Sequence, residues 1–130
     1  MNAFEKRISL EDIKPGVVVW PVFSVTGSVA AVCNPAKFIS GVFKCPVVGK
    51  MRFQWDPENS YHTSYLEDSN VKGAGTRQYN FHALFLNEKD AEEYAAMINN
   101  NQLPDDLREL RDEFVKQKQE EREMDSGSWW

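Results

Sequence analysis

The sequence has little of what metal sites, cofactor sites and most catalytic sites require. Two histidines and two cysteines occur in 130 residues, whereas a zinc centre needs four ligands arranged in close pairs. Cys33 and Cys45 lie in apolar segments without a CxxC spacing, so we interpret them as buried, reduced residues, with a disulfide between them as the lesser alternative. No metal, no cofactor and no catalytic set is predicted.

A basic surplus and long apolar runs are missing as well. Lys and Arg number 15 against 20 Asp and Glu, which gives a net charge of -5 and argues against a surface that is basic all over and binds nucleic acid. No apolar run approaches the ~20 residues that cross a bilayer, and residues 1–7 are polar and charged rather than signal-like. We therefore expect a cytoplasmic protein with no membrane partner.

The first hundred residues are typical of a globular domain and rich in predicted strands. Hydrophobic residues make up 42% of the chain, enough for a core at this length. Met51, Phe53 and Trp55 alternate with polar residues, the period-two pattern of a half-buried strand. Pro21 removes a ladder donor and predicts an edge strand or a bulge. Further strands are expected at residues 17–25, 29–33, 38–45, 61–66 and 78–85.

Two helices are predicted after the strands. Asn87 can cap a helix that carries apolar residues at helical spacing up to Ile98. Pro104 suits the first turn of a second helix. That helix has a narrow apolar stripe made of Leu103, Leu107, Leu110 and Phe114. Residues 116–123 are all Lys, Gln, Glu or Arg, so this part of the helix has nothing to bury in its own domain.

The predicted fold is therefore α+β. It consists of a small bent antiparallel sheet, or a partial SH3-like barrel, of five or six strands followed by two C-terminal helices. Residues 1–100 are expected to form the α+β domain, residues 101–124 the amphipathic and then charged helix, and residues 125–130 a flexible tip. The likeness to SH3-like small barrels concerns the first of these segments and rests on the order of the elements.

The last residues of the sequence are its most unusual feature. The polar helix leads to two tryptophans, the residue type enriched at interface hot spots. In composition this tail is similar to the acidic, aromatic-ended C-termini of bacterial and phage single-stranded-DNA-binding proteins, which recruit replication partners. The resemblance is carried by Glu120, Glu121, Glu123, Asp125, Trp129 and Trp130, and it implies docking to a protein. The alternative is that the tryptophans fold back onto the domain or end a disordered tail.

We therefore predict a non-enzymatic protein-binding or adaptor module, which binds either another protein or a second copy of itself. Its small size, its many aromatic residues and the missing active site also fit a phage or mobile-element accessory protein that acts on a host protein through the helix and the tip. The residues expected to bind the partner are Leu103, Leu107, Leu110, Phe114, Trp129 and Trp130.

A single-stranded nucleic-acid-binding protein is the first alternative. Cations would contact phosphates while neighbouring aromatic side chains stack on bases, and the acidic tail would recruit partners. The cations are Lys50, Arg52, Lys72 and Arg77, and the aromatic residues are Phe53, Trp55, Tyr79 and Phe81. The glycine-containing loop between the last two cations also has the composition of a phosphate-binding loop, although a hairpin loop is the simpler interpretation.

A small hydrolase is the second alternative. His62 lies in sequence near Ser60, Ser64 and Asp56, and His82 lies within an aromatic strand. A histidine titrates near neutrality and would serve as the base for a nucleophile. This alternative requires a concave pocket that converges on one of the two histidines.

Overall fold

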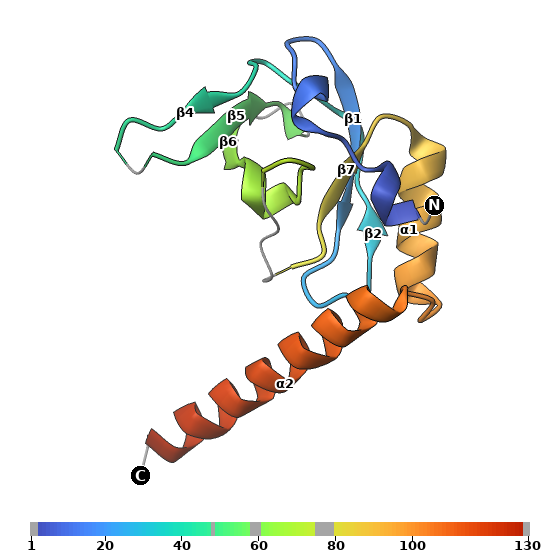
Figure 1. Ribbon diagram of the computed structural model, residues 1–130, viewed down its shortest axis with the longest axis vertical. Helices are drawn as coiled ribbons and strands as arrows, with labels where there is room; N and C mark the ends of the chain where they lie inside the picture. The colour runs from blue at the N-terminus through green and yellow to red at the C-terminus, as the bar shows by residue number, and fades with distance from the viewer. Residues whose placement is uncertain (1–2, 48, 58–60, 75–79, 129–130) are drawn as a thin grey trace.

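A computed structural model describes residues 3–47, 49–57, 61–74 and 80–128, with side chains described as far as Gln117. The strands precede both α-helices in the chain (Figure 1). The strands are β1 (Val18–Phe23), β2 (Ala31–Val32), β3 (Ala36–Lys37), β4 (Phe43–Lys44), β5 (Met51–Trp55), β6 (His62–Tyr65) and β7 (Ala83–Phe85). The helices are the 3-10 turns η1 (Ala3–Lys6), η2 (Leu10–Asp12) and η4 (Leu66–Ser69), and the α-helices α1 (Glu88–Asn99) and α2 (Asp105–Ser128).

β1 is the central strand of the first sheet. β7 pairs with it antiparallel on one side, and β2 and then β3 pair with it on the other. Val22 lies opposite Val32 and Val19 opposite Ala36, so the outer strand uses one residue more than β1 between these pairs. The extra residue is a β-bulge. Pro21, which has no N–H to donate, therefore lies in the central strand beside a bulge and not at an edge.

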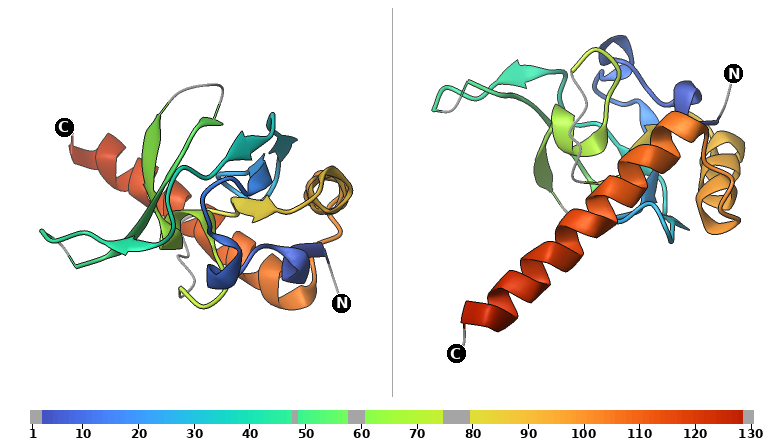
Figure 2. Two further views of the ribbon diagram at one scale, coloured as in Figure 1. Left: turned by 90° about the horizontal axis from the view of Figure 1, so that it is seen from above. Right: turned by 60° about the horizontal axis from the view of Figure 1, so that its bottom comes forward.

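The second sheet has the strand order β4–β5–β6. The chain that leaves β3 joins it to the first sheet, because the Ile39 N–H donates to the Gln54 carbonyl at 2.8 Å and Phe38 forms an antiparallel bridge with Trp55. The sheets and α1 form three layers, with the first sheet in the middle (Figures 1 and 2). One bent stretch of chain thus takes part in both sheets.

The predicted class is confirmed, since antiparallel sheets precede two C-terminal helices. The described residues form seven strands in two sheets, and neither sheet closes, so the SH3-like barrel is not confirmed. Two segments expected as continuous strands, residues 29–33 and 38–45, contribute only short pairs. The reason is that the chain passes from the first sheet to the second between them.

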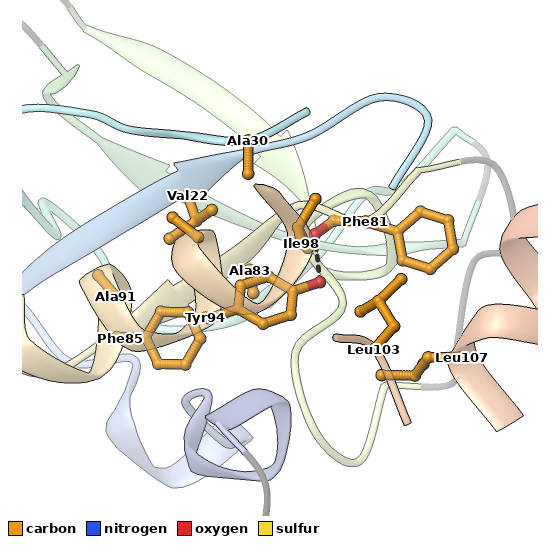
Figure 3. Packing of buried hydrophobic residues seen from close by; sticks show 11 residues of the cluster. Val22, Ala30, Phe81, Ala83, Phe85, Ala91, Tyr94, Ile98, Leu103 and Leu107 are labelled. Carbon is orange, nitrogen blue, oxygen red and sulfur yellow. Dashed lines mark hydrogen bonds between the residues drawn. The ribbon is translucent and has the colours of Figure 1, made fainter. Parts of the chain in front are cut away.

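Two clusters of buried side chains lie on opposite faces of the first sheet. On one face α1 packs Ala91, Tyr94 and Ile98 against the sheet (Figure 3). The Asn87 side chain caps this helix, as predicted, by accepting the Asp90 backbone N–H at 2.9 Å. The second cluster lies between the two sheets and consists of Ile8, Ile13, Val19, Ala36, Phe38, Phe53, Leu66, Val71 and Leu84.

Polar side chains of α1 tie the helix to distant parts of the chain. The Tyr94 hydroxyl donates to the Phe81 carbonyl at 2.7 Å, the dashed line in Figure 3, and burial raises the pKa of this phenol above its ordinary value. At the end of the helix the Asn99 amide donates to the Ala30 carbonyl at 3.0 Å and accepts the Ala30 N–H at 2.8 Å. Both ties satisfy backbone groups that would otherwise be costly to bury.

Candidate protein-binding surfaces

The predicted apolar stripe marks the place where α2 joins the rest of the protein. Leu103 and Leu107 are buried in the first cluster, and Leu110 packs against it while partly exposed. Phe114 is 8% exposed. The root of the helix, residues 103–114, is therefore packed within a single chain. This is one of the two predicted arrangements, the other being packing against a second copy.

A glycine turn lies under the root of α2. Gly27 has a φ of +77°, and its N–H donates to the Ser24 hydroxyl at 3.1 Å. A Cβ atom at this position would lie 2.8 Å from the Phe81 ring and 3.1 Å from the Arg111 side chain. Only glycine adopts this backbone conformation readily and also leaves room for the Phe81 ring.

Beyond its root, α2 continues away from the domain. We define the body as residues 3–114, the arm as residues 115–128 and the tip as Trp129 and Trp130. The arm is an unbroken helix to Ser128, and Figure 1 shows it standing clear of both sheets. The tip lies outside the described residues. The backbone of the arm therefore does not lie on either sheet in this view.

Two of the predicted phosphate contacts lie together at one aromatic ring. The Lys50 ammonium lies 5.6 Å and the Arg52 guanidinium 5.0 Å from the centroid of Tyr65. The Lys50 Nζ also forms an ion pair with Glu67 at 2.8 Å. A cavity of about 460 Å³ beside this pair is lined by Glu67 as well. A carboxylate at this position opposes the binding of a phosphate.

Two of the four aromatic residues of the nucleic-acid hypothesis are buried in the core. Phe53 is 0% and Phe81 6% exposed, and stacking on bases needs exposed ring faces. The Lys72 backbone forms a parallel bridge with Ser9. Arg77 and Tyr79 lie outside the described residues. The described part of the chain thus gives this hypothesis two neighbouring cations, while two of the four predicted aromatic rings are buried and cannot stack on bases.

The two cysteines differ in exposure. Cys45 is buried as predicted, whereas Cys33 is exposed, so the interpretation of Cys33 as a buried residue is wrong, and no disulfide joins the two. Its place beside the bulge, where the outer strand bends, explains the exposure. Among the described residues no three His, Cys, Asp or Glu side chains gather as a metal site. No described helix is long and apolar enough to cross a membrane.

A cavity of about 270 Å³ opens between the two sheets. It continues the second cluster, with which it shares Leu84. We call it the intersheet pocket. Its lining residues are Pro21, Val22, Phe23, Cys33, Asn34, Trp55, Pro57, Ser64, Asp68, Ser69, His82 and Leu84. Side chains from β1, β5, β6, β7 and η4 thus converge on one hollow that the sequence did not indicate.

Aromatic rings form the walls of the intersheet pocket. Phe23 and His82 stack with ring centroids 4.3 Å apart and an angle of 23° between their planes. From the second sheet, the Trp55 Nε1–H donates to the Ser64 hydroxyl at 3.0 Å, which fixes the indole. Phe23 is 55% exposed, so an aromatic surface is open to solvent at the pocket. No Lys or Arg occurs among its described lining residues.

His82 lines this pocket and accepts a hydrogen bond from the backbone. The Ser24 backbone N–H donates to its Nδ1 at 2.9 Å, so the proton of the neutral ring is on Nε2. A general base of the triad type has the opposite arrangement, with a free lone pair at Nε2. Burial also lowers the pKa of His82, which keeps the ring neutral. The concave pocket that the hydrolase hypothesis requires is thus present at His82, but the tautomer of this histidine is not the one that a triad-type general base needs.

His62 and Cys33 do not complete a catalytic set either. His62 is exposed on β6, opposite Trp55. Cys33 follows β2, and His82 precedes β7. Because β2 and β7 pair with opposite edges of β1, the backbones of Cys33 and His82 are two strand spacings apart, about 10 Å. A nucleophile and its base need hydrogen-bond distance.

Comparison with known proteins identifies a family. The model of a family described as Phage g100-like protein matches residues 7–98. The matched segment includes all seven strands and α1 up to Ile98, and it leaves α2 outside. No curated protein and no solved structure matches the chain significantly.

Proposed function

Because the chain belongs to the Phage g100-like protein family, we propose that it is a non-enzymatic phage protein that binds another protein. The body serves as a rigid scaffold, and the arm and the tip are the binding elements. The intramolecular packing of the stripe residues gives the arm a fixed starting direction. Binding through a helix that is already oriented loses less conformational entropy than binding through a flexible tail.

The observation that carries this proposal is the continuation of α2 past its buried root. Phe114 is the last buried side chain in the described part of the helix, and the helix extends to Ser128, about 21 Å further at 1.5 Å per residue. An isolated helix of this length is marginal in water. The arm therefore gains little from its own body, and a second protein surface would stabilise it.

The composition of the arm and tip supports a protein partner more than a nucleic acid. Residues 116–123 are all charged or Gln, with acidic residues in the majority over the last turns, and two tryptophans follow. Trp anchors surrounded by charged residues have the composition of an interface hot spot with a polar rim. The arm has three basic residues against four acidic ones, so it has no surplus of positive charge with which to bind phosphates.

Affinity capture tests this proposal. The full chain, a Trp129→Ser/Trp130→Ser variant and a version that ends at Val115 are used as baits in a nuclease-treated lysate of a bacterial host that also contains an untagged copy of the chain. We expect a partner that only the unaltered chain retains. A Glu88→Gln/Glu92→Gln variant is the control, because it removes exposed acidic charges from α1 and leaves the arm unchanged.

The alternatives give different results in the same experiment. Equal capture by all three baits would contradict a role for the arm and tip. A partner that nuclease treatment removes, and that the shortened version binds more strongly, would favour the nucleic-acid hypothesis. In that case Lys50→Gln and Arg52→Gln, at the pair of cations around Tyr65, should reduce the binding.

A further inference from the structure

We propose that the intersheet pocket is a binding site for a tryptophan side chain, and that this side chain comes from the tip of a second copy of the chain. The inference rests on the proposed function, because it assumes that the arm and tip bind protein. It names both the partner and the place on the partner where the tip would lie.

The volume of the pocket suits a single side chain better than a cofactor or a larger ligand. Its volume of about 270 Å³ is below the range of roughly 300–1,000 Å³ that is typical of small-molecule and cofactor sites. The described lining has no Lys or Arg to balance a phosphate or a carboxylate. A nucleotide or an anionic metabolite is therefore a poor occupant, the more so because Asp68 adds an acidic residue to the lining, whereas one large neutral ring fits the volume.

The walls of the pocket suit an indole. The stacked pair of Phe23 and His82 and the fixed ring of Trp55 offer aromatic faces from two sides, and aromatic rings gain energy in offset or edge-on contacts beyond the area that they bury. A buried indole N–H needs an acceptor. Two polar residues, Asn34 and Ser69, line the same hollow, and an amide or hydroxyl oxygen can accept such a hydrogen bond.

The tip cannot occupy the pocket of its own chain while α2 is helical. α2 is continuous to Ser128, and Figure 1 shows this end of the helix standing clear of both sheets. Two further residues extend at most about 7 Å. Docking on the same body would need a break in the arm. Docking on a second body needs none, so the second copy is the occupant that the geometry permits.

An exchange of tips between two copies also gives a closed assembly. Each copy supplies one tip and one pocket, so two equivalent contacts form around a two-fold axis. The second contact forms within an existing pair and benefits from a high effective concentration. We therefore expect a dimer rather than an open chain of copies.

Sedimentation velocity over a range of protein concentrations tests the proposal with full-length variants. Trp129→Ser/Trp130→Ser removes the tip, Phe23→Ser removes a pocket wall, and Cys33→Trp fills the pocket from an exposed position. Val18→Ser is the matched control, because Val18 is an exposed residue at the other end of β1 (47% exposed). We expect the unaltered chain and the control to dimerise, and each of the other variants to dimerise at least about tenfold more weakly, as for a hot-spot residue.

A mixing experiment separates this proposal from the proposed function. The tip variant retains its pocket and the Phe23→Ser variant retains its tip, so an equimolar mixture should form a complex that neither variant forms alone. Failure of the mixture to associate, or an unaltered chain that stays monomeric throughout, would overturn the tip-in-pocket contact. The proposed function fails separately, if lysate capture is unaffected by loss of the arm and tip. Circular dichroism of each variant establishes that the body is folded.

Discussion

The body and the arm of this protein are both regular in structure, but different forces hold them. The body is held by contacts between residues far apart in sequence, such as the Asn99 amide on the Ala30 backbone and Tyr94 on the Phe81 carbonyl. The arm continues one helix past the last of these contacts. A helix without tertiary packing depends on local hydrogen bonds alone and is marginally stable. The body is therefore expected to be independent of the arm, whereas the arm depends on a second surface.

A substitution in the first cluster should lower the free energy of unfolding more than any other change proposed here. Leu103 is 1% exposed and packs in the first cluster, where it attaches α2 to the body. Leu103→Ala leaves a cavity and should lower the free energy of unfolding by about 3 kcal/mol, within the usual 2–5 kcal/mol for such changes. Met124→Ala in the arm is the control and should change it by less than about 0.5 kcal/mol. Equal losses in urea denaturation would show that the arm is part of the body.

A pair of glycines separates backbone strain from crowding under the helix root. Gly27 and Gly16 both have positive φ angles, +77° and +89°, but a Cβ atom meets the Phe81 ring at Gly27 and nothing within 4 Å at Gly16. Gly16→Ala should cost about 1 kcal/mol from strain alone. Gly27→Ala should cost about 1–2 kcal/mol more, because a buried ring must move. Similar thermal midpoints for the two variants would mean that α2 is not pressed against the turn.

A smaller effect should appear in the pH dependence of the body. Burial lowers the pKa of His82 below its ordinary value of 6.5, so the unfolded chain binds a proton more readily than the folded one. The stabilisation is complete above about pH 6.5 and is lost as the pH falls through the pKa of the folded state. We expect His82→Gln to remove part of the stability loss between pH 7 and 5, and Val18→Ser, an exposed substitution without a titrating group, to leave it unchanged. An identical loss in all three proteins would contradict the buried, hydrogen-bonded setting of His82.

The smallest effect on the body should come from breaking the arm itself. Gln119→Pro removes a helical hydrogen bond and introduces a steric clash in the arm. The helical signal in circular dichroism should fall, while the free energy of unfolding of the body stays within about 0.5 kcal/mol of its value in the unaltered chain. A large loss of stability would show that the arm packs on the domain that carries it.

The helices were largely predictable from the sequence, because their signals are local. Asn87 caps α1 as expected, and the stripe from Leu103 to Phe114 marks the buried root of α2. Met51 was expected on the buried face of its strand together with Phe53, but it is 42% exposed. The pattern of one strand shows which residues share a face, but it does not show how far the opposite sheet extends to cover them.

The intersheet pocket could not be predicted in the same way. It depends on Phe23 and His82 meeting across β1 and β7, and on Trp55 facing them from the second sheet. These pairings follow from the register around the bulge near Pro21 and from the bend that carries the chain between the sheets. Both features are tertiary, and no short spacing in the sequence indicates them. The sequence marks His82 as a titrating group, but its tautomer depends on the backbone N–H of Ser24, which donates to its Nδ1.

Hydrogen exchange measured at several protein concentrations tests the central claim most directly, because it reports on the arm and the body in one sample. At low concentration the amides of residues 115–128 should exchange rapidly while those of α1 and β1 are protected, because only the latter are held by tertiary packing. As the concentration rises, protection should increase in the arm and at the intersheet pocket together. Strong protection of the arm at the lowest concentration would contradict the account, since it would show that the arm is packed on its own body.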